Sequence, residues 1–185
     1  MKASSRRTID RDGLIRPAAR HEIPEIEHLH VAAYAQYRDD APPAIFEAYN
    51  RDLRNLARYW DEAEVFVADI DRRIAGAVLF YADASSEGLG LPPGWAGFRK
   101  LAVHPAMRGK GLGVKLVEAC LDLARERGAE TMGIHSASLM RAACHLYETM
   151  GFERCPAYDI QASDGLGVDS GSGEVSLIAY RRHLS

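Results

Sequence analysis

A glycine-rich turn between a strand-like segment and a helix-like segment constrains this chain most. The run Arg108-Gly-Lys-Gly-Leu-Gly113 follows an apolar segment that ends at Val103, and an amphipathic segment over 112–126 begins within it. Alternate glycines allow positive φ values and let a ligand approach the backbone closely. The N–H groups of such a turn and the positive end of the helix dipole suit a pyrophosphate. A connector that binds nothing is the alternative interpretation.

The spacing of the glycines separates this turn from two other phosphate-binding motifs. A Walker A loop requires GxxxxGK followed by Ser or Thr, and the sequence contains no such run. The dinucleotide fingerprint GxGxxG does not match either, because the glycines here follow G-x-G-x-G. That fingerprint is also expected early in a doubly wound domain rather than past residue 105. The spacing therefore argues against an NTPase and against a nucleotide-binding dehydrogenase.

Composition and charge bound the class of protein. A length of 185 residues predicts one domain, which we place at 13–185 after a flexible N-terminal arm at 1–12. The net charge of −3 does not favour a nucleic-acid partner. We expect no membrane partner, since no apolar run approaches the about 18 residues of a membrane span. The start of the chain lacks the apolar core of a secretory signal, and three cysteines without a CxxC pair favour reduced thiols, so we expect a cytoplasmic location.

Hydrophobic periodicity predicts strands and helices that alternate along the chain. A domain of this kind is α/β or α+β, with helices packed against a sheet. The predicted strands are 14–17, 64–68, 73–81, 95–103, 131–135, 152–158 and 175–180. The predicted helices are 24–37, 44–60, 112–126 and 139–150. We expect a loop at 159–173, where Gly, Ser and Asp are frequent, and this loop could reach over a substrate site.

The glycine turn resembles the acetyl-CoA pyrophosphate loop of the GNAT N-acetyltransferase superfamily, through Arg-x-x-Gly-x-Gly at Arg108, Gly111 and Gly113. The preceding run Phe98-Arg-Lys-Leu-Ala-Val-His-Pro also resembles that family, and Leu146-Tyr-Glu-Thr-Met-Gly-Phe resembles its L-Y-E-x-x-G-F signature. The resemblance covers about residues 95–155. It implies the α/β (α+β) GNAT fold, with a central mixed, mostly antiparallel sheet of about six to seven strands. Helices would cover both faces, and the fourth and fifth strands would splay apart.

The resemblance also implies acetyl-CoA as a co-substrate, an amine as the acceptor and no metal. The pantetheine arm would pair with backbone groups of the fourth strand, and the pyrophosphate would contact backbone N–H groups of the glycine turn. The implied cofactor-binding residues are Leu101, Ala102, Val103, Arg108, Gly109, Lys110, Gly111, Leu112, Gly113 and Val114.

One catalytic residue is expected from the same resemblance, and a second candidate takes the place of a family residue that this sequence lacks. Tyr147 takes the place of the family's proton donor to the departing CoA sulfur. Many relatives use a glutamate of the fourth strand as the base, but residues 97–104 contain no acid. We take His135 as the candidate base, because its unperturbed pKa of about 6.5 suits that task. A hydrogen-bonded histidine at the end of a strand, with no catalytic role, is the alternative interpretation. Glu87 and a chain of waters are the alternatives, and Met140 replaces an asparagine that relatives often carry.

Transfer of an acetyl group to a small amine, a peptide N-terminus or a lysine is the leading hypothesis. Transfer of another acyl group is the first alternative. The second is a regulatory module that binds acyl-CoA without catalysis, although such a module would not need Tyr147 as a proton donor. The sequence leaves open the identity of the acceptor and whether the chain forms a homodimer.

Overall fold

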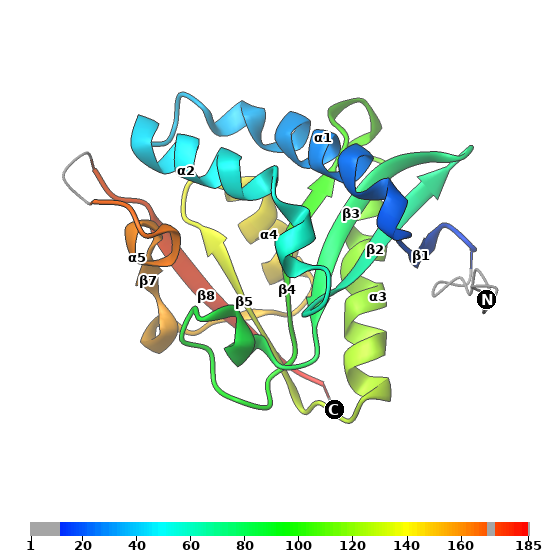
Figure 1. Ribbon diagram of the computed structural model, residues 1–185. Helices are drawn as coiled ribbons and strands as arrows, with labels where there is room; N and C mark the ends of the chain where they lie inside the picture. The colour runs from blue at the N-terminus through cyan, green and yellow to red at the C-terminus, as the bar shows by residue number, and fades with distance from the viewer. Residues whose placement is uncertain (1–11, 170–172, 185) are drawn as a thin grey trace.

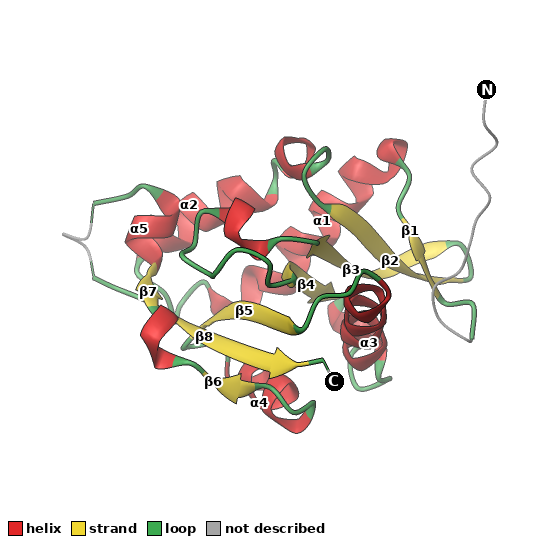
Figure 2. Ribbon diagram, turned by 90° about the horizontal axis from the view of Figure 1, so that it is seen from below, coloured by secondary structure: helices red, strands yellow, loops and turns green. Residues whose placement is uncertain are grey.

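Two antiparallel sheets form the centre of the fold (Figures 1 and 2). The computed structural model describes residues 12–169 and 173–184, so the predicted arm at 1–12 lies outside the described residues except for Asp12. The first sheet has the order β1-β2-β3-β4. Its strands are β1 (Ile15–Pro17), β2 (Glu64–Ile70), β3 (Arg73–Tyr81) and β4 (Gly97–Val103).

The second sheet is built around the C-terminal strand. It has the order β5-β8-β6, and β7 pairs with another part of β8. These strands are β5 (Thr131–Ala137), β6 (Glu153–Arg154), β7 (Ile160–Gln161) and β8 (Ser176–His183). A single parallel bridge, Ala96 to Met132, joins the two sheets in the described part of the chain. The expected mixed, mostly antiparallel arrangement is confirmed, with eight described strands rather than six to seven.

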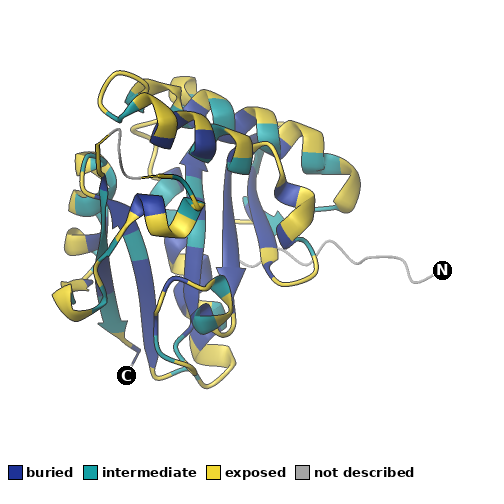
Figure 3. Cartoon of the chain, turned by 60° about the vertical axis from the view of Figure 1, so that its left-hand side comes forward, coloured by how far each residue is buried: buried dark blue, intermediate teal, exposed yellow. Residues whose placement is uncertain are grey.

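Helices cover both faces of the first sheet, as expected. They are α1 (Ile23–Tyr34) on one face and α3 (Leu112–Glu126) on the other. The other described helices are α2 (Pro43–Leu53), α4 (Arg141–Thr149) and α5 (Ala162–Leu166). Side chains alternate along β3, so that Ala77 and Leu79 join the core under α1 while Val78 and Phe80 join the core under α3. Figure 3 shows these strands buried between helices whose outer surfaces are exposed. Burial on both faces explains the continuous apolar run of β3.

Three predicted elements were wrong, each for an identifiable reason. The helix predicted at 44–60 ends at Leu53, and a 3-10 turn at Leu56–Tyr59 follows. Leu56 and Tyr59 are buried in the same core as α1, so the apolar periodicity continues past the end of the helix. The strand predicted at 152–158 pairs only over Glu153–Arg154, because Pro156 begins a 3-10 turn and lacks an N–H for the ladder.

The predicted loop at 159–173 was wrong for a tertiary reason. It contains β7 and α5, and Ala162 of α5 is buried in a small cluster with Ile45 of α2 and Ala137 of β5. A contact between three distant segments therefore orders a stretch whose composition predicts a loop.

The structure bears on three expectations about partners and thiols. Cys120, Cys144 and Cys155 are free thiols, and Cys120 is buried. Among the described helices, none has the length and apolar character that crossing a bilayer requires. Within 12–169 and 173–184, no group of three or more His, Cys, Asp or Glu side chains is arranged to hold a metal ion.

Candidate active site

A cavity opens where β4 and β5 separate. The N–H of Ala96 donates to the carbonyl of Thr131 over 3.0 Å, and the N–H of Gly133 donates to the carbonyl of Ala96 over 2.8 Å. Beyond this contact, the described part of β4 pairs with β3 and that of β5 pairs with β8. The cavity has a volume of about 460 Å³, and residues of α1, α2, α4 and α5 complete its walls. The predicted splay of these two strands is therefore confirmed.

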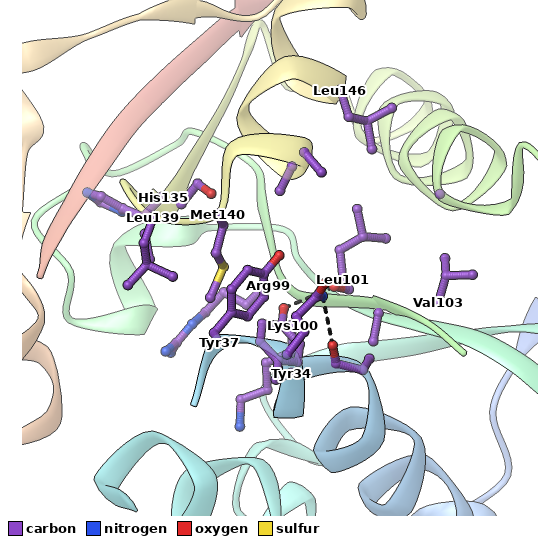
Figure 4. A pocket seen from close by; sticks show the side chains of 18 of the residues that line it. Tyr34, Tyr37, Arg99, Lys100, Leu101, Val103, His135, Leu139, Met140 and Leu146 are labelled. Atoms are coloured by element: carbon purple, nitrogen blue, oxygen red, sulfur yellow. Dashed lines mark hydrogen bonds between the residues drawn. The ribbon is translucent and has the colours of Figure 1, made fainter. Parts of the chain in front are cut away.

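Most of the predicted site residues line this one cavity. They are Leu101, Ala102, Val103, Arg108, Gly109, Gly111, Leu112, Gly113, Val114, His135 and Tyr147. Lys110 lies outside the lining, with its ammonium 3.7 Å from the sulfur of Met107. Glu87 is also outside the lining and lies behind Arg99. Figure 4 shows side chains from β4, α1 and the segment before α4 facing the same space.

A bulge in β4 shapes one wall of the cavity. Ala77 pairs with Ala102 and Leu79 pairs with Arg99, so a step of two residues on β3 matches a step of three on β4. Lys100 adopts a φ of 52°, a conformation that costs a non-glycine residue about 1–2 kcal/mol. Such an extra residue bends its strand and turns backbone groups away from the ladder.

Side chains of α1 bind the carbonyl groups at this bulge. The Nε2 of His30 lies 2.9 Å from the carbonyl oxygen of Lys100, and the Tyr34 hydroxyl donates to the carbonyl of Leu101 over 2.9 Å. Burial lowers the pKa of His30 to about 3, so the imidazole is neutral and its Nε2–H donates. A buried histidine and a half-buried tyrosine thus replace the strand partners that the bulge removes, and Figure 4 draws the hydrogen bond of Tyr34.

The side chain of Lys100 fixes the same bulge to α2. Its ammonium lies 2.9 Å from the carboxylate of Asp52, donates to the Asp52 carbonyl over 2.8 Å and lies 4.1 Å from the centre of the Tyr59 ring. Burial lowers the pKa of Lys100 to about 8, against the effect of Asp52. Burial acts to raise the pKa of Asp52, but Lys100, the Tyr59 hydroxyl and Arg99 together outweigh it, and the net shift of the pKa is downward. The pair is therefore buried and mutually stabilised.

The glycine turn has the backbone that the sequence predicts. Gly109 and Gly111 have φ values of 74° and 75°, and a Cβ at either position would meet no atom within 4 Å. Positive φ, rather than crowding, therefore explains these two glycines. Gly111 is the N-cap of α3, and no side chain caps that helix. The N–H groups of its first turn consequently remain available to an anion.

Arg108 has a different role from the one its sequence position suggests. Its guanidinium donates to the Gln36 side chain over 3.1 Å and to the Ala33 carbonyl over 2.9 Å. Ala33 belongs to α1, and Gln36 lies in the turn that follows this helix. Arg108 therefore links the glycine turn to α1, and it also lines the cavity.

Tyr147 lies on α4 and faces the cavity from an aromatic cluster. It is 6% exposed, and its ring centre lies 5.6 Å from that of Phe98 and 5.9 Å from that of Phe152. Burial raises the pKa of Tyr147 well above its usual value, and nearby phenols add to the shift. The hydroxyl is therefore protonated at neutral pH and can donate a proton or a hydrogen bond.

His135 lies on β5 at the edge of the cavity. Its Nε2 is 2.8 Å from the carbonyl oxygen of Tyr158, so this nitrogen carries the proton and donates it. Its Nδ1 is buried and has no hydrogen-bond partner in the described part of the chain. Burial lowers the pKa of His135, so the imidazole is neutral and its one free lone pair is on Nδ1.

Further residues line the cavity beside those predicted to be catalytic or to bind the cofactor. Tyr34 and Tyr49 have ring centres 5.4 Å apart, and both line the cavity with Tyr37. Arg99 also lines it, with its Nε 3.1 Å from the Glu87 carboxylate. Burial raises the pKa of Glu87 to about 7, although Arg99 acts to lower it. Tyr49 lies on an apolar helical stripe typical of a core, so no local signal could have identified it.

Comparisons with known proteins agree with this geometry. Residues 24–152 match the model of the acetyltransferase (GNAT) family. The L-amino acid N-acyltransferase MnaT of Escherichia coli K12 is 34% identical over 127 residues, which cover 59% of this chain and 72% of that protein. The L-methionine sulfoximine/L-methionine sulfone acetyltransferase of Salmonella typhimurium gives the same identity and coverage. The structure of Salmonella typhimurium YncA with acetyl-CoA superposes with a TM-score of 0.61 at 21% identity, over 92% of this chain and 93% of that chain.

Proposed function

Since the chain belongs to the acetyltransferase (GNAT) family, we propose that the cavity between β4 and β5 is the site of its reaction. The enzyme is an acyltransferase that moves an acetyl group from acetyl-CoA to an amine. One observation carries the assignment of the site: the bulged β4, the glycine turn and Tyr147 line the same cavity. These three features come from separate segments, and each supplies a different requirement of the transfer.

The residues around the cavity fit acetyl-CoA. The edge of β4 that faces β5 has no strand partner beyond Ala96 in the described residues, so Leu101, Ala102 and Val103 can pair with an extended chain. The uncapped first turn of α3 and the open space at Gly109 and Gly111 suit a pyrophosphate. Backbone donors of the turn and of α3 would then hold the phosphates.

Tyr147 is proposed as the proton donor to the departing sulfur. A thiolate leaves more readily when it is protonated or hydrogen-bonded, and general acids typically contribute about 10²–10⁴-fold in rate. The raised pKa of Tyr147 keeps its proton available at neutral pH. Its packing against Phe98 and Phe152 limits the orientations of the ring. A positioned, protonated phenol is what this step needs.

His135 is proposed as the group that accepts the proton of the attacking amine. An alkyl amine has a pKa of about 10.4, so it must lose a proton before or during attack. The imidazole of His135 is neutral and has a lone pair without a partner on Nδ1. Because Nδ1 is buried, the ring would have to turn for this atom to reach the amine. Glu87 is a weaker candidate because it lies behind Arg99 and does not line the cavity. A chain of waters remains the alternative route.

An amino acid is the proposed class of acceptor. Two relatives carry names that state L-amino acids or methionine derivatives as substrates. The part of the cavity beyond β4 and β5 has apolar and aromatic walls from α2, the segment before α4, α5 and β8, which fit a small acceptor with an uncharged side chain. The residues in these walls are Ile45, Phe46, Tyr49, Leu139, Met140, Leu166 and Leu177.

Release of free CoA thiol from acetyl-CoA, measured with a panel of amino acids, amines and peptides, tests the proposal. We expect rapid thiol release with one or more small amino acids and slow release with long peptides. Measured binding of acetyl-CoA with no thiol release for any amine would contradict catalysis and favour a binding module instead.

A further inference from the structure

The charges around the cavity are unbalanced. Three of its described lining residues carry a cationic side chain, namely Arg99, Lys100 and Arg108, and no described lining residue is Asp or Glu. Two of these cations are already engaged: Lys100 by Asp52, and Arg108 by acceptors on or next to α1. Arg99 is therefore the cation that a ligand within the cavity can use.

Arg99 presents unused donors to the cavity. A guanidinium has five N–H groups in a planar fork. Its Nε lies 3.1 Å from the Glu87 carboxylate, and no hydrogen bond from its terminal amino groups is formed with any described residue. The Arg99 side chain is 20% exposed and lines the cavity, while that of Glu87 is 2% exposed and does not line it, so Arg99 is the member of this pair that a ligand in the cavity can reach. Two parallel N–H groups of this kind match the two oxygens of a carboxylate.

Glu87 acts as a support behind the guanidinium rather than as a competing ligand. It lies beneath β4 because Gly97 leaves room: a Cβ at Gly97 would come within 3.2 Å of the Glu87 side chain and 2.7 Å of Ala84. The contact with Glu87 is made at Nε, so it does not use the two terminal amino groups of Arg99. Figure 4 shows Arg99 on the same side of the pocket as Tyr37, His135 and Leu139.

The remaining walls restrict the rest of the ligand. Tyr37, Tyr49, Leu139 and Leu177 offer apolar and aromatic surface, and the cavity lacks a carboxylate that would pair with a second cationic group. A diamine or a lysine side chain in a basic peptide would find no partner there for its extra charge. An acceptor with one amine, one carboxylate and an uncharged side chain fits this cavity, because its carboxylate can pair with Arg99 and its side chain can contact the apolar walls.

We propose that Arg99 binds the α-carboxylate of the acceptor, so that the enzyme selects free amino acids with uncharged side chains over amines that lack a carboxylate. This inference rests on the proposed function, because it assigns the acceptor to the same cavity. Arg99 is then a specificity-determining residue. It sets the orientation of the acceptor while the transfer itself depends on other groups.

Matched acceptors and one pair of variants test this assignment. The wild type is assayed for CoA thiol release with leucine, leucinamide and isoamylamine, which share a side chain and differ at the carboxylate. We expect kcat/KM for leucine to exceed that for the other two by roughly 10- to 100-fold, the range of a charge-assisted hydrogen-bonded pair. In Arg99→Gln this preference should disappear through a raised KM for leucine, and Arg99→Lys should restore part of it.

The ratio of kcat/KM for leucine to that for leucinamide is compared within each variant, so a general loss of activity in Arg99→Gln cancels, and the affinity for acetyl-CoA is the control for folding. A leucine preference that survives in Arg99→Gln would overturn the inference, as would a wild type that uses isoamylamine as well as leucine. A dipeptide with N-terminal leucine should react like leucinamide, and reaction like the free acid would overturn the assignment to an α-carboxylate. If no amine releases thiol, the proposed function fails instead.

Discussion

The ammonium of Lys100 lies 2.9 Å from the carboxylate of Asp52, and this buried pair ties the bulge of β4 to α2. His30 and Tyr34 of α1 hold the carbonyls of the same bulge. The two helices that hold the bulge also contribute walls to the cavity. Buried polar contacts therefore couple the shape of the acceptor side to the backbone that is proposed to bind acetyl-CoA.

Removal of the Asp52 carboxylate should destabilise the fold. Asp52→Ala leaves the Lys100 ammonium, which is 1% exposed, without its counter-charge. Breaking a buried ion pair in this way typically lowers the free energy of unfolding by about 3–5 kcal/mol. Urea unfolding of the wild type and Asp52→Ala measures this loss. Asp61→Ala is the control, because the Arg20–Asp61 pair is well exposed and its loss should barely change the unfolding midpoint. Equal effects of the two substitutions would contradict a stabilising role for the buried pair.

Loss of the Tyr147 hydroxyl should slow turnover without weakening acetyl-CoA binding. Tyr147→Phe retains the ring that packs against Phe98 and removes only the proposed acid, so kcat should fall by about 10²–10⁴-fold. Tyr180→Phe is a matched control, because its hydroxyl donates to Glu148 and the residue does not line the cavity. An unchanged kcat in Tyr147→Phe would remove the proposed role.

The role of His135 can be separated from a structural one by substitution with glutamine. In His135→Gln the amide N–H can still donate to the Tyr158 carbonyl, but the basic nitrogen is gone. For the wild type, kcat/KM should fall as pH drops through the lowered pKa of His135, since the imidazole must be neutral to accept a proton. This acidic limb should vanish in His135→Gln together with most of the activity. If the acidic limb of the pH profile persists in His135→Gln, a chain of waters rather than His135 accepts the proton.

A glutamate in the glycine turn should abolish acetyl-CoA binding. Gly111→Glu places a bulky anion at the start of α3, where φ is 75° and the N–H groups are uncapped. Calorimetric titration with acetyl-CoA should show at least a roughly tenfold loss of affinity, or about 1.4 kcal/mol. Gly128→Glu carries the same charge at a φ of 76° at the other end of α3 and should bind normally. Normal binding by Gly111→Glu would contradict the pyrophosphate site.

Glu87 should make stability depend on pH. Burial raises its pKa from 4.5 to about 7 in the folded protein, so between these values the unfolded chain ionises first while the folded protein keeps its proton. The folded state then binds more protons, and stability falls as pH rises from about 4.5 to about 7. The urea midpoints of the wild type and Glu87→Gln should therefore diverge as pH rises from about 4.5 to about 7, because the wild type loses more stability than the variant. Parallel pH profiles would show that Glu87 is not the cause.

Local patterns predicted the elements and the motifs of this protein. The β2–β3 hairpin, the amphipathic α3 and the glycine turn each depend on residues that are close in sequence, because periodicity and positive φ are local properties. The motif around Tyr147 was also visible without the structure. The same local information misplaced the end of α2 and missed α5, since Leu56 and Ala162 are ordered by packing against distant segments.

The sequence by itself determined the family, the backbone of the glycine turn that is proposed to bind acetyl-CoA, and the two catalytic candidates. Tertiary structure alone decided the bulge at Lys100, the Lys100–Asp52 pair and the exposure of Arg99 above Glu87. The residues of the first pair are 48 positions apart, and lysine has no intrinsic preference for a φ of 52°. The conformation of Lys100 persists because side chains of α1 bind the carbonyl groups of the bulge and Asp52 of α2 pairs with the Lys100 ammonium. The strand alone would leave these carbonyl groups and this charge unpaired.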